Sequence, residues 1–413
     1  MLNWANQFNI FCYLDNLHYN FQPHYYECLL AVGVRALISS DTSDVSELDH
    51  FLAMQNDWSC GHIAYNLKSS LHGLSNNKPD SLHFPDFFFF VPEVILTING
   101  NELCIEATSP EEVYLQIMQQ EEHAIQPHAN LNIQQRITRA EYLQTIRKLQ
   151  QHILRGDCYE INFCQEFYAE KAIIEPLSIY QKLIAVSPTP FSALYRLNDK
   201  YLICASPERY IAKEGTKILS QPMKGTAKRN LDDEAEDRRL KEELLASSKE
   251  RAENVMVVDL VRNDLSKICK GATVKVDELY GIYTFPQVHQ MVSTVSGELD
   301  GNVPFSAILP ATFPMGSMTG APKYRVMQLI DQYEPSNRGI FSGSVGYIDP
   351  NGNFDFNVVI RSIMYNASNQ YLSYQVGSGI TFYSDAEKEW EECMLKAEAI
   401  KRVLGAELTI LHG

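Results

Sequence analysis

Short apolar runs separated by turn residues recur along most of this 413-residue chain, and they limit its fold more than any other feature. Asn99 and Gly100 join two alternating runs in the way a hairpin turn does. Helical stretches interrupt the runs irregularly, so we predict an α+β fold with large, mostly antiparallel sheets rather than a doubly wound one. The runs that we expect to form strands in the later part of the chain are 161–168, 192–197, 201–205, 210–213, 342–348, 356–365 and 371–376.

Charge and composition exclude several classes of protein. The chain has 35 Lys and Arg against 51 Asp and Glu, a formal net charge of −16, which argues against binding to nucleic acid. No stretch approaches the roughly 20 apolar residues of a membrane span, and the most apolar run, 87–91, is expected to be a buried strand. The N-terminus lacks the basic and apolar regions of a signal peptide. Nine cysteines without a CxxC pair predict neither a disulfide framework nor a zinc site, and they suit a reducing cytoplasm.

A polar segment from Gln119 to Asn132, which contains Pro127, is the expected internal boundary. We therefore divide the chain into an N-terminal part, residues 1–130, and a second region, residues 131–413, which carries the motifs described next.

Two acidic pairs at helical spacing are candidate metal ligands. The last predicted helix begins with a capping box from Ser384 to Glu387 and ends at Gly405. On one flank, which we expect to be partly buried, Glu389, Glu392 and Lys396 follow each other at spacings of three and four. Two carboxylates and a lysine could hold Mg²⁺ and an anion, but a salt-bridged helix surface explains the same spacing and is favoured by it alone.

Glu250 and Glu253 repeat this spacing just before a second apolar run. Together the four glutamates could build one metal site from two helices, although the sequence by itself does not bring the helices together.

Three further residues have both a chemical and an ordinary interpretation. Lys224, held between Pro and Gly on an expected loop, is either a preorganised nucleophile or a solvated lysine. Glu208 is a general acid if its pKa is raised, and otherwise it pairs with Arg209. Arg361, in an alternating run, is either a carboxylate clamp or part of a solvated strand face. The glycine-rich segments, which we expect to be turns, do not fit nucleotide-binding motifs.

Seven segments in order resemble the chorismate-utilising enzymes, a family that includes anthranilate, aminodeoxychorismate, isochorismate and salicylate synthases. The resemblance covers roughly residues 135–405 and includes Ser-Pro-Glu-Arg at 206–209 and Met-Lys-Gly-Thr at 223–226. The other segments are 156–163, 249–264, 313–323, 341–347 and 377–396. The resemblance implies a compact two-layer arrangement of antiparallel sheets flanked by helices, with the N-terminal part packed into the same body.

Within this family the residue at position 224 separates the reactions. Anthranilate and isochorismate synthases resemble one another in having a small residue there, whereas aminodeoxychorismate synthases have Lys, as this chain does. The resemblance implies that Lys224 attacks C2 of chorismate while Glu208 protonates the departing C4 hydroxyl. Ammonia then adds at C4 and expels the lysine, which gives 4-amino-4-deoxychorismate, a precursor of p-aminobenzoate and folate.

The resemblance also assigns binding residues. It implies that Glu253 and Glu392 are Mg²⁺ ligands, with Glu250 and Glu389 contacting the ion directly or through water. His289 matches a histidine that contacts substrate. The positions that match substrate-carboxylate binding are Gly225, Thr226, Arg361, Gly377, Gly379 and Lys396.

This sequence departs from the family pattern at three points. Glu160 stands where hydrating relatives have a water-activating lysine and amine-transferring relatives usually have Gln. The Leu-Leu-Glu-Ser motif of tryptophan-regulated relatives is absent, and the N-terminal part is only weakly similar to the family throughout. Apart from these departures, we find no amidotransferase segment. We therefore expect a separate glutamine amidotransferase subunit to supply ammonia. The alternatives are an anthranilate synthase component I and a non-catalytic chorismate-binding partner of an amidotransferase.

Overall fold

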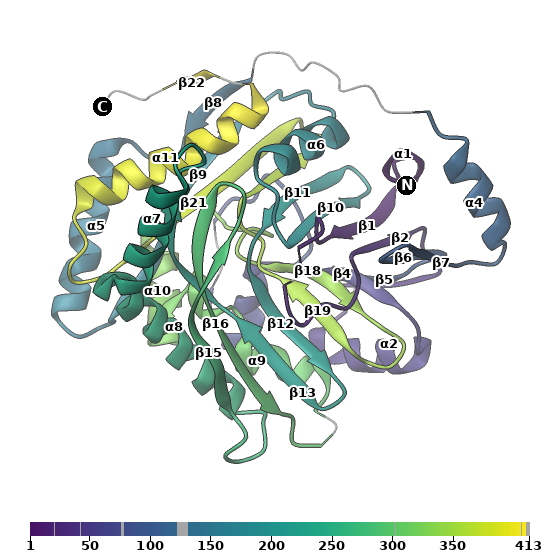
Figure 1. The fold of residues 1–413 in the computed structure, drawn as a ribbon, viewed down its shortest axis with the longest axis horizontal. Helices are drawn as coiled ribbons and strands as arrows, with labels where there is room; N and C mark the ends of the chain where they lie inside the picture. Colours follow the sequence, from purple (N-terminus) through teal and green to yellow (C-terminus); the bar gives the residue numbers. More distant parts are fainter. Residues whose placement is uncertain are drawn as a thin grey trace.

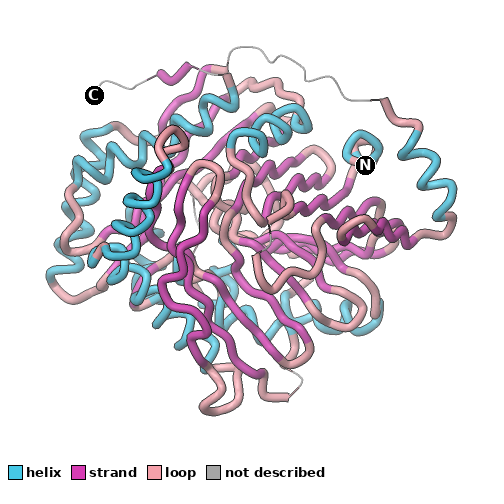
Figure 2. The backbone as a smooth tube through the Cα atoms, viewed as in Figure 1, coloured by secondary structure: helices cyan, strands magenta, loops and turns pink. Residues whose placement is uncertain are grey.

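Two large sheets form the centre of the protein (Figures 1 and 2). The computed structural model describes residues 1–19, 21–41, 43–75, 78–121, 131–301, 303–405 and 407–409. The predicted boundary segment includes residues 122–130, which lie outside the described residues. Strands from the first 106 residues enter both sheets: residues 10–15 pair with residues 192–197, and residues 59–63 pair with residues 344–348.

The first sheet has 12 strands in the order β22-β8-β9-β21-β20-β11-β10-β1-β2-β6-β7, with β17 paired to β9. Its strands are β1 (Ile10–Asp15), β2 (Cys28–Val32), β6 (Val94–Asn99), β7 (Glu102–Glu106), β8 (Asn132–Gln135), β9 (Glu160–Ala169), β10 (Phe191–Leu197), β11 (Lys200–Ser206), β17 (Gly320–Ala321), β20 (Ser362–Asn366), β21 (Tyr371–Ile380) and β22 (Glu407–Thr409).

The second sheet has 10 strands in the order β14-β16-β13-β12-β19-β18-β4-β5-β3, with β15 paired to β16. Its strands are β3 (Ala36–Ser39), β4 (Ser59–Ile63), β5 (Phe87–Val91), β12 (Arg209–Glu214), β13 (Lys217–Gln221), β14 (Met223–Lys228), β15 (Lys275–Thr284), β16 (Val288–Glu298), β18 (Ser344–Ile348) and β19 (Phe354–Asn357). Among the described strands, only β22 and β8 pair in parallel, so the predicted α+β fold with mostly antiparallel sheets is confirmed.

Helices cover the outer faces of the two sheets (Figure 1). They are α1 (Leu2–Ala5), α2 (Leu48–Gln55), α3 (Lys68–His72), α4 (Pro110–Met118), α5 (Arg139–Leu154), α6 (Pro176–Val186), α7 (Glu234–Ala246), α8 (Ser248–Ser266), α9 (Phe305–Thr312), α10 (Lys323–Tyr333) and α11 (Ala386–Leu404). None of the helices in the described ranges combines the length and the apolar character that crossing a bilayer requires.

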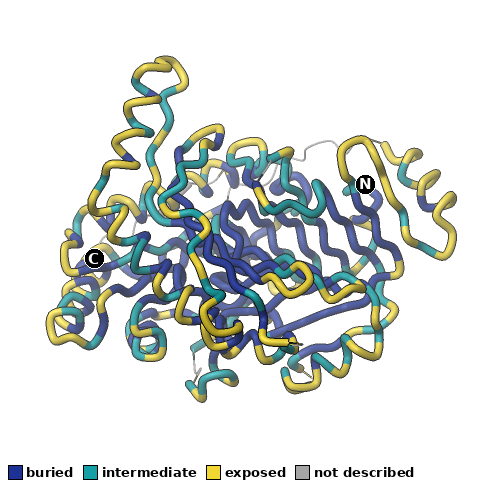
Figure 3. Tube along the Cα trace, turned by 60° about the horizontal axis from the view of Figure 1, so that its bottom comes forward, coloured by how far each residue is buried: buried dark blue, intermediate teal, exposed yellow. Residues whose placement is uncertain are grey.

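The two-residue period of the strands divides the core into two main clusters. Along β11, Leu202 and Cys204 join one cluster, whereas Ile203 and Ala205 join the other, because successive side chains point to opposite faces. The first cluster lies between the sheets and extends to α8 and α9, and the second packs under α5, α6, α10 and α11. Buried residues are concentrated on the strands, and exposed ones lie along the outer helices and loops (Figure 3).

Several local predictions are confirmed. Strands β6 and β7 form the hairpin expected at Asn99 and Gly100, and residues 87–91 form the fully buried strand β5. Gly405 ends α11 in the left-handed conformation, with φ of 57°. The N-cap of this helix differs from the prediction: Asp385 accepts hydrogen bonds from the first-turn N–H groups, while the Ser384 hydroxyl accepts one from Thr381 N.

Two segments differ more strongly from the prediction. Residues 356–365 do not form one strand, because the chain leaves the second sheet after β19, crosses between the sheets and enters the first sheet as β20. Conversely, the glycines at 377 and 379 do not form a turn but continue β21 to Ile380. Both differences affect the site described next.

Candidate active site

Lys224 lies on a strand rather than on the predicted loop. The register between β14 and β16 shifts between Met223 and Thr226, so Lys224 and Gly225 sit in an irregularity that redirects the side chains. Gly225 has φ of 86°, and a Cβ there would lie 3.0 Å from a carboxylate oxygen of Glu250, so the backbone and α8 approach closely. The sequence therefore places Lys224 at the edge of the second sheet, where it faces the first.

The partner of Lys224 is Glu160, at the start of β9 in the opposite sheet. Lys224 Nζ donates to Glu160 Oε1 at 2.8 Å, and the two side chains are only 12% and 3% exposed. Burial alone lowers the pKa of Lys224, but the Glu160 carboxylate outweighs it and the pKa is raised overall. In the resting arrangement Lys224 is therefore an ammonium.

Glu208 and Arg361 lie on the two chain segments that pass from one sheet to the other. Glu208 connects β11 to β12, and Arg361 precedes β20. The crossings hydrogen-bond to each other, because Val358 N donates to Glu208 O and Ala205 N donates to Arg361 O, at 3.0 and 3.3 Å. Glu208 and Arg361 are consequently held in a fixed relation to both sheets.

Burial raises the pKa of Glu208 to about 7, although the Ser317 hydroxyl, Lys224 and Arg361 act in the opposite direction. This carboxyl is 4% exposed and does not pair with Arg209, which binds Asp355 instead. A carboxyl that keeps its proton near neutral pH, beside a lysine, can act as a general acid.

Arg361 has few partners for a half-buried guanidinium. Among the described residues its guanidinium makes one hydrogen bond, from Nη2 to Gln290 Oε1 at 3.4 Å. Gln290 also accepts from the Thr226 hydroxyl at 2.9 Å and donates to Gly225 O at 2.7 Å. Gln290 thus joins three of the predicted binding residues, and most donors of Arg361 stay available to an anion.

His289 is not brought together with these residues. It precedes Gln290 on β16, so its side chain points to the other face of the sheet. There its two ring nitrogens lie 3.0 Å from the Thr284 hydroxyl and 3.1 Å from Asp237 Oδ1, the latter on α7. The prediction that His289 contacts substrate does not agree with this geometry, in which Gln290 occupies the inward position.

The glycines of β21 make room for neighbouring side chains. A Cβ at Gly379 would lie 2.9 Å from both Glu160 Oε1 and Lys224 Nζ, and one at Gly377 would lie 2.5 Å from Asn162 Oδ1. Lys396 of α11 reaches the same strand, because its Nζ donates to Gly377 O at 3.1 Å. Gly379 therefore borders the Lys224 pair, and Lys396 contacts the same strand two residues before it.

The four predicted metal ligands share one electrostatic environment. Glu250, Glu253, Glu389 and Glu392 all raise the pKa of Lys249, although they come from α8 and α11. Burial raises the pKa of Glu253 to about 7, with the negative charges of Glu250 and Glu160 adding to it, and burial also raises that of Glu389.

The flank of α11 is only partly buried, because Glu389 is 6% exposed whereas the side chains of Glu392 and Lys396 are 50% and 46% exposed and pair at 2.7 Å. In the described part of the chain, no three His, Cys, Asp or Glu side chains converge as closely as metal ligands do. The donor chemistry and the excess negative charge nevertheless fit a hard divalent cation.

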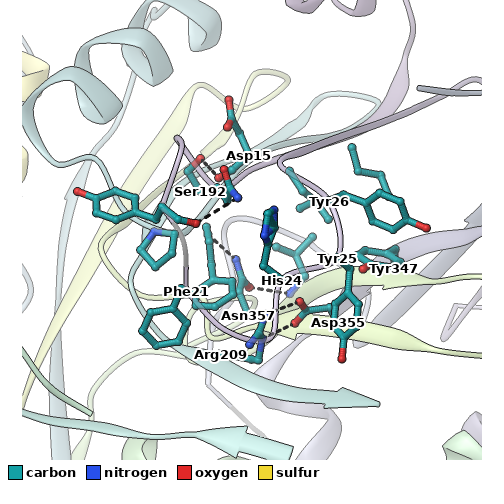
Figure 4. A pocket seen from close by; sticks show the side chains of 17 residues that line it. Asp15, Phe21, His24, Tyr25, Tyr26, Ser192, Arg209, Tyr347, Asp355 and Asn357 are labelled. Carbon is teal, nitrogen blue, oxygen red and sulfur yellow. Dashed lines mark hydrogen bonds and ion pairs between the residues drawn. The ribbon is translucent and has the colours of Figure 1, made fainter. Parts of the chain in front are cut away.

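A separate pocket lies where the N-terminal part meets β10, β12 and β19 (Figure 4). Its walls are largely aromatic, with Phe21, Tyr25, Tyr26 and Tyr347 among them. Arg209, which also lines it, donates four hydrogen bonds, two to Asp355 and one each to Gln221 and Pro23 O. The predicted site residues do not line this cavity.

Two residues near Lys224 were not found from the sequence. Gln290 was overlooked in favour of its neighbour, although the alternation of a strand offered a signal. Ser317, in the short helix after α9, had none, because it meets Glu208 only through the folding of distant segments.

Comparison with known proteins agrees with this architecture. Residues 23–402 match the model of the chorismate binding enzyme family. The chain is 33% identical over 348 residues to aminodeoxychorismate synthase component 1 of Escherichia coli, covering 83% of this chain and 76% of that protein. It is equally 33% identical, over 358 residues, to anthranilate synthase component 1 of Thermus thermophilus, with coverage of 83% and 76%.

A crystal structure of anthranilate synthase component I from Streptococcus pneumoniae has the same fold, with a TM-score of 0.81, 24% identity and coverage of 93% of this chain and 94% of that one. The family match extends over both the N-terminal part and the region that holds Lys224 and Glu208. The chain therefore belongs to the chorismate-binding enzyme family.

Proposed function

We propose that this protein is the chorismate-using component of an aminodeoxychorismate synthase. It converts chorismate and ammonia into 4-amino-4-deoxychorismate and water. The observation that carries this proposal is the position of Lys224, a buried amine close to a carboxyl whose pKa is about 7. A chain that only bound chorismate would have no use for a buried nucleophile beside a general acid.

In this proposal Lys224 is the nucleophile and Glu208 the general acid. The Lys224 nitrogen forms a bond to C2 of the ring, the double bond shifts, and the C4–oxygen bond breaks as Glu208 delivers its proton, so that water leaves. Ammonia then adds at C4, the double bond shifts back, and the bond between C2 and Lys224 breaks. Two allylic displacements replace one difficult substitution at C4.

Apart from His289, the remaining predicted residues bind substrate or metal in this proposal. Arg361, with its unused donors, takes a substrate carboxylate together with Lys396, Thr226 and the backbone at Gly225, Gly377 and Gly379. Glu250, Glu253, Glu389 and Glu392 are the residues that would hold Mg²⁺. When bound, Mg²⁺ neutralises a substrate carboxylate and offsets the charge that develops on the ring.

Relatives named component 1 motivate a second component. We infer that ammonia comes from a separate glutamine amidotransferase subunit, and that free ammonia replaces it at high concentration.

Product analysis tests the proposal. Purified protein is mixed with chorismate, Mg²⁺ and ammonium at mildly alkaline pH, and the products are separated and identified by mass. We expect 4-amino-4-deoxychorismate from the wild type and a large loss in Lys224→Ala. Anthranilate as the product, or an undiminished rate in Lys224→Ala, would contradict the proposal. So would unreacted chorismate both with ammonia and with glutamine plus an amidotransferase subunit.

A further inference from the structure

The carboxylate that faces Lys224 has no role in the reaction as proposed so far. Glu160 is 2% exposed, and its Oε1 accepts the hydrogen bond from Lys224 Nζ at 2.8 Å. Gly379 stands beside this contact without a side chain, and a Cβ there would crowd both atoms at 2.9 Å. The contact is thus enclosed between the two sheets, away from bulk water.

The second oxygen of this carboxylate is unsatisfied. Glu160 Oε2 is buried and has no hydrogen-bond partner in the described part of the protein. A buried anionic oxygen without a donor costs free energy, on the order of 1–3 kcal/mol or more for a charged group. Oε2 is therefore an acceptor that the described residues leave unused.

Lys224 has the opposite requirement. As an ammonium it has no lone pair, so it cannot form a bond to carbon until a proton leaves. Among the described residues the one ion pair of Lys224 is with Glu160. The carboxylates of Glu208 and Glu253 act on its charge from the sheet crossing and from α8, and Arg361 lies near Glu208.

We propose that Glu160 is the proton acceptor that turns Lys224 from an ammonium into the attacking amine. This inference rests on the proposed function, in which Lys224 is the nucleophile. The proton moves along the existing hydrogen bond from Nζ to Oε1, which leaves a neutral amine and a neutral carboxyl. The freed lone pair bonds to C2, and the adduct is a secondary ammonium.

The cycle closes without any further reagent. When ammonia adds at C4, the C2–nitrogen bond breaks, and its electron pair returns to Lys224 as the neutral amine. Glu160 then gives the proton back through the same hydrogen bond, and Glu208 regains its own proton from solvent. The net reaction is chorismate plus ammonia to amino product plus water.

The test compares Glu160→Gln with the wild type. Glutamine has the same shape and can still hold Lys224 Nζ through its amide oxygen, but it cannot accept the proton. In the wild type the proton stays within the pair, so this step does not depend on pH. In Glu160→Gln the proton must leave to solvent, so the ratio of its kcat to that of the wild type should rise about tenfold per pH unit below the pKa of Lys224.

The measurement is kcat for 4-amino-4-deoxychorismate formation from about pH 5.5 to 9, at saturating Mg²⁺ and a constant concentration of free ammonia. Glu166→Gln is the matched control, because Glu166 is a second buried glutamate of β9, which pairs with Arg136 and Tyr371 instead. Its ratio to the wild type should stay constant over the same range. Because the charge of Glu160 helps to raise the pKa of Glu253, Mg²⁺ is kept saturating at every pH so that the titration of Glu253 does not enter the comparison.

If the ratio of kcat in Glu160→Gln to kcat in the wild type stays constant over this pH range, the inference is wrong, whatever the value of the ratio. If Glu160→Ala is inactive while Glu160→Gln matches the wild type at every pH, Glu160 only positions Lys224. Failure of the proposed function looks different: the wild type makes another product or none, or Lys224→Ala matches the wild type. The Glu160→Gln comparison therefore follows the demonstration that Lys224→Ala lowers the rate of product formation.

Discussion

Two arginines, the buried Arg209 and the half-buried Arg361, show how differently this protein uses the same side chain. Arg209, in the wall of the aromatic cavity, gives its donors to Asp355, Gln221 and a backbone carbonyl, so it is a structural element (Figure 4). Arg361, near Glu208, makes a single 3.4 Å hydrogen bond among the described residues. Burial and charge are therefore poor guides to binding, and the number of unused donors is a better one.

The same contrast holds for the carboxyl groups of the two regions. Asp355 meets a bidentate partner, whereas Glu160 has an unpaired oxygen and Glu208 and Glu253 have pKa values raised to about 7. Such unsatisfied groups destabilise the free protein, and a ligand that satisfies them gains affinity or reactivity. Each experiment below tests one side of this contrast.

The largest effect is expected for Glu208→Gln, which removes the proton donor but keeps the shape. Loss of a general acid should lower kcat about 10²–10⁴-fold. In the wild type Glu208 is protonated below its pKa of about 7, so kcat should fall as pH rises above 7, and this fall should be missing from the variant. Rates of product formation measured across pH test both the lower kcat and the missing fall above pH 7. An unchanged kcat in the variant would show that another group is the general acid.

Replacing each of the two arginines with alanine should have opposite effects on stability and on kcat/KM. Arg209→Ala leaves Asp355 buried and unpaired, which should lower the free energy of unfolding by about 3–5 kcal/mol with little change in kcat/KM of the folded protein. Arg361→Ala should lower kcat/KM for chorismate about 10–100-fold and hardly change stability. Denaturant unfolding and steady-state kinetics on both variants provide the comparison, and the reverse pattern would refute it.

Gly379→Ala tests the importance of the space beside the Lys224–Glu160 pair without changing any charge. Its Cβ would lie 2.9 Å from both atoms of the Lys224 pair, so the pair must move. A displacement of about 1 Å can reduce a rate on the order of 10²-fold, and we expect a loss of this size in kcat. Gly271→Ala is the control, because a Cβ at Gly271 meets nothing within 4 Å. Equal kcat in the two variants would show that the space at Gly379 does not matter.

The smallest effect is expected from the metal. Mg²⁺ at 100 times its Kd should stabilise the folded protein by about 2.7 kcal/mol, seen as a rise in Tm. Because the pKa of Glu253 is about 7, protons compete for this ligand below that pH, and the rise in Tm should shrink as pH falls from 8 to 6. Glu392→Gln should also reduce it, whereas Glu243→Gln, on the exposed face of α7, should not. If the rise in Tm with Mg²⁺ changes neither with pH nor in Glu392→Gln, these glutamates are not the Mg²⁺ ligands.

Much of the fold could be predicted because its signals are local. Alternation and turn residues indicated the antiparallel strands, and the Asn99 and Gly100 hairpin was readable from two neighbouring runs. The break between β19 and β20 at residues 358–361 could not be predicted, because these four residues fit a continuous strand equally well. Only the pairing of β19 and β20 with different sheets requires the chain to cross there.

The candidate site was predictable in its parts and not in its assembly. The spacing of the glutamates indicated two helix faces, but their shared influence on Lys249 depends on how α8 and α11 are packed. The position of His289 shows a second limit. Because strand side chains alternate, neighbouring residues point to opposite faces of the sheet. Here His289 faces α7, whereas Gln290 faces the candidate site. Glu160 and Lys224, 64 positions apart, meet only through the two sheets.

The two hydrogen-bonded crossings have a consequence for how this protein can be altered. Glu208 and Arg361 each lie on a segment that continues into a strand of both sheets, so a movement of one sheet against the other would displace the two side chains together. An insertion or a chain break at the exposed turn after β6 should cost little, whereas one at either crossing should uncouple the sheets. New substrate preferences are therefore more accessible through the helix that holds Lys396 than through these two segments.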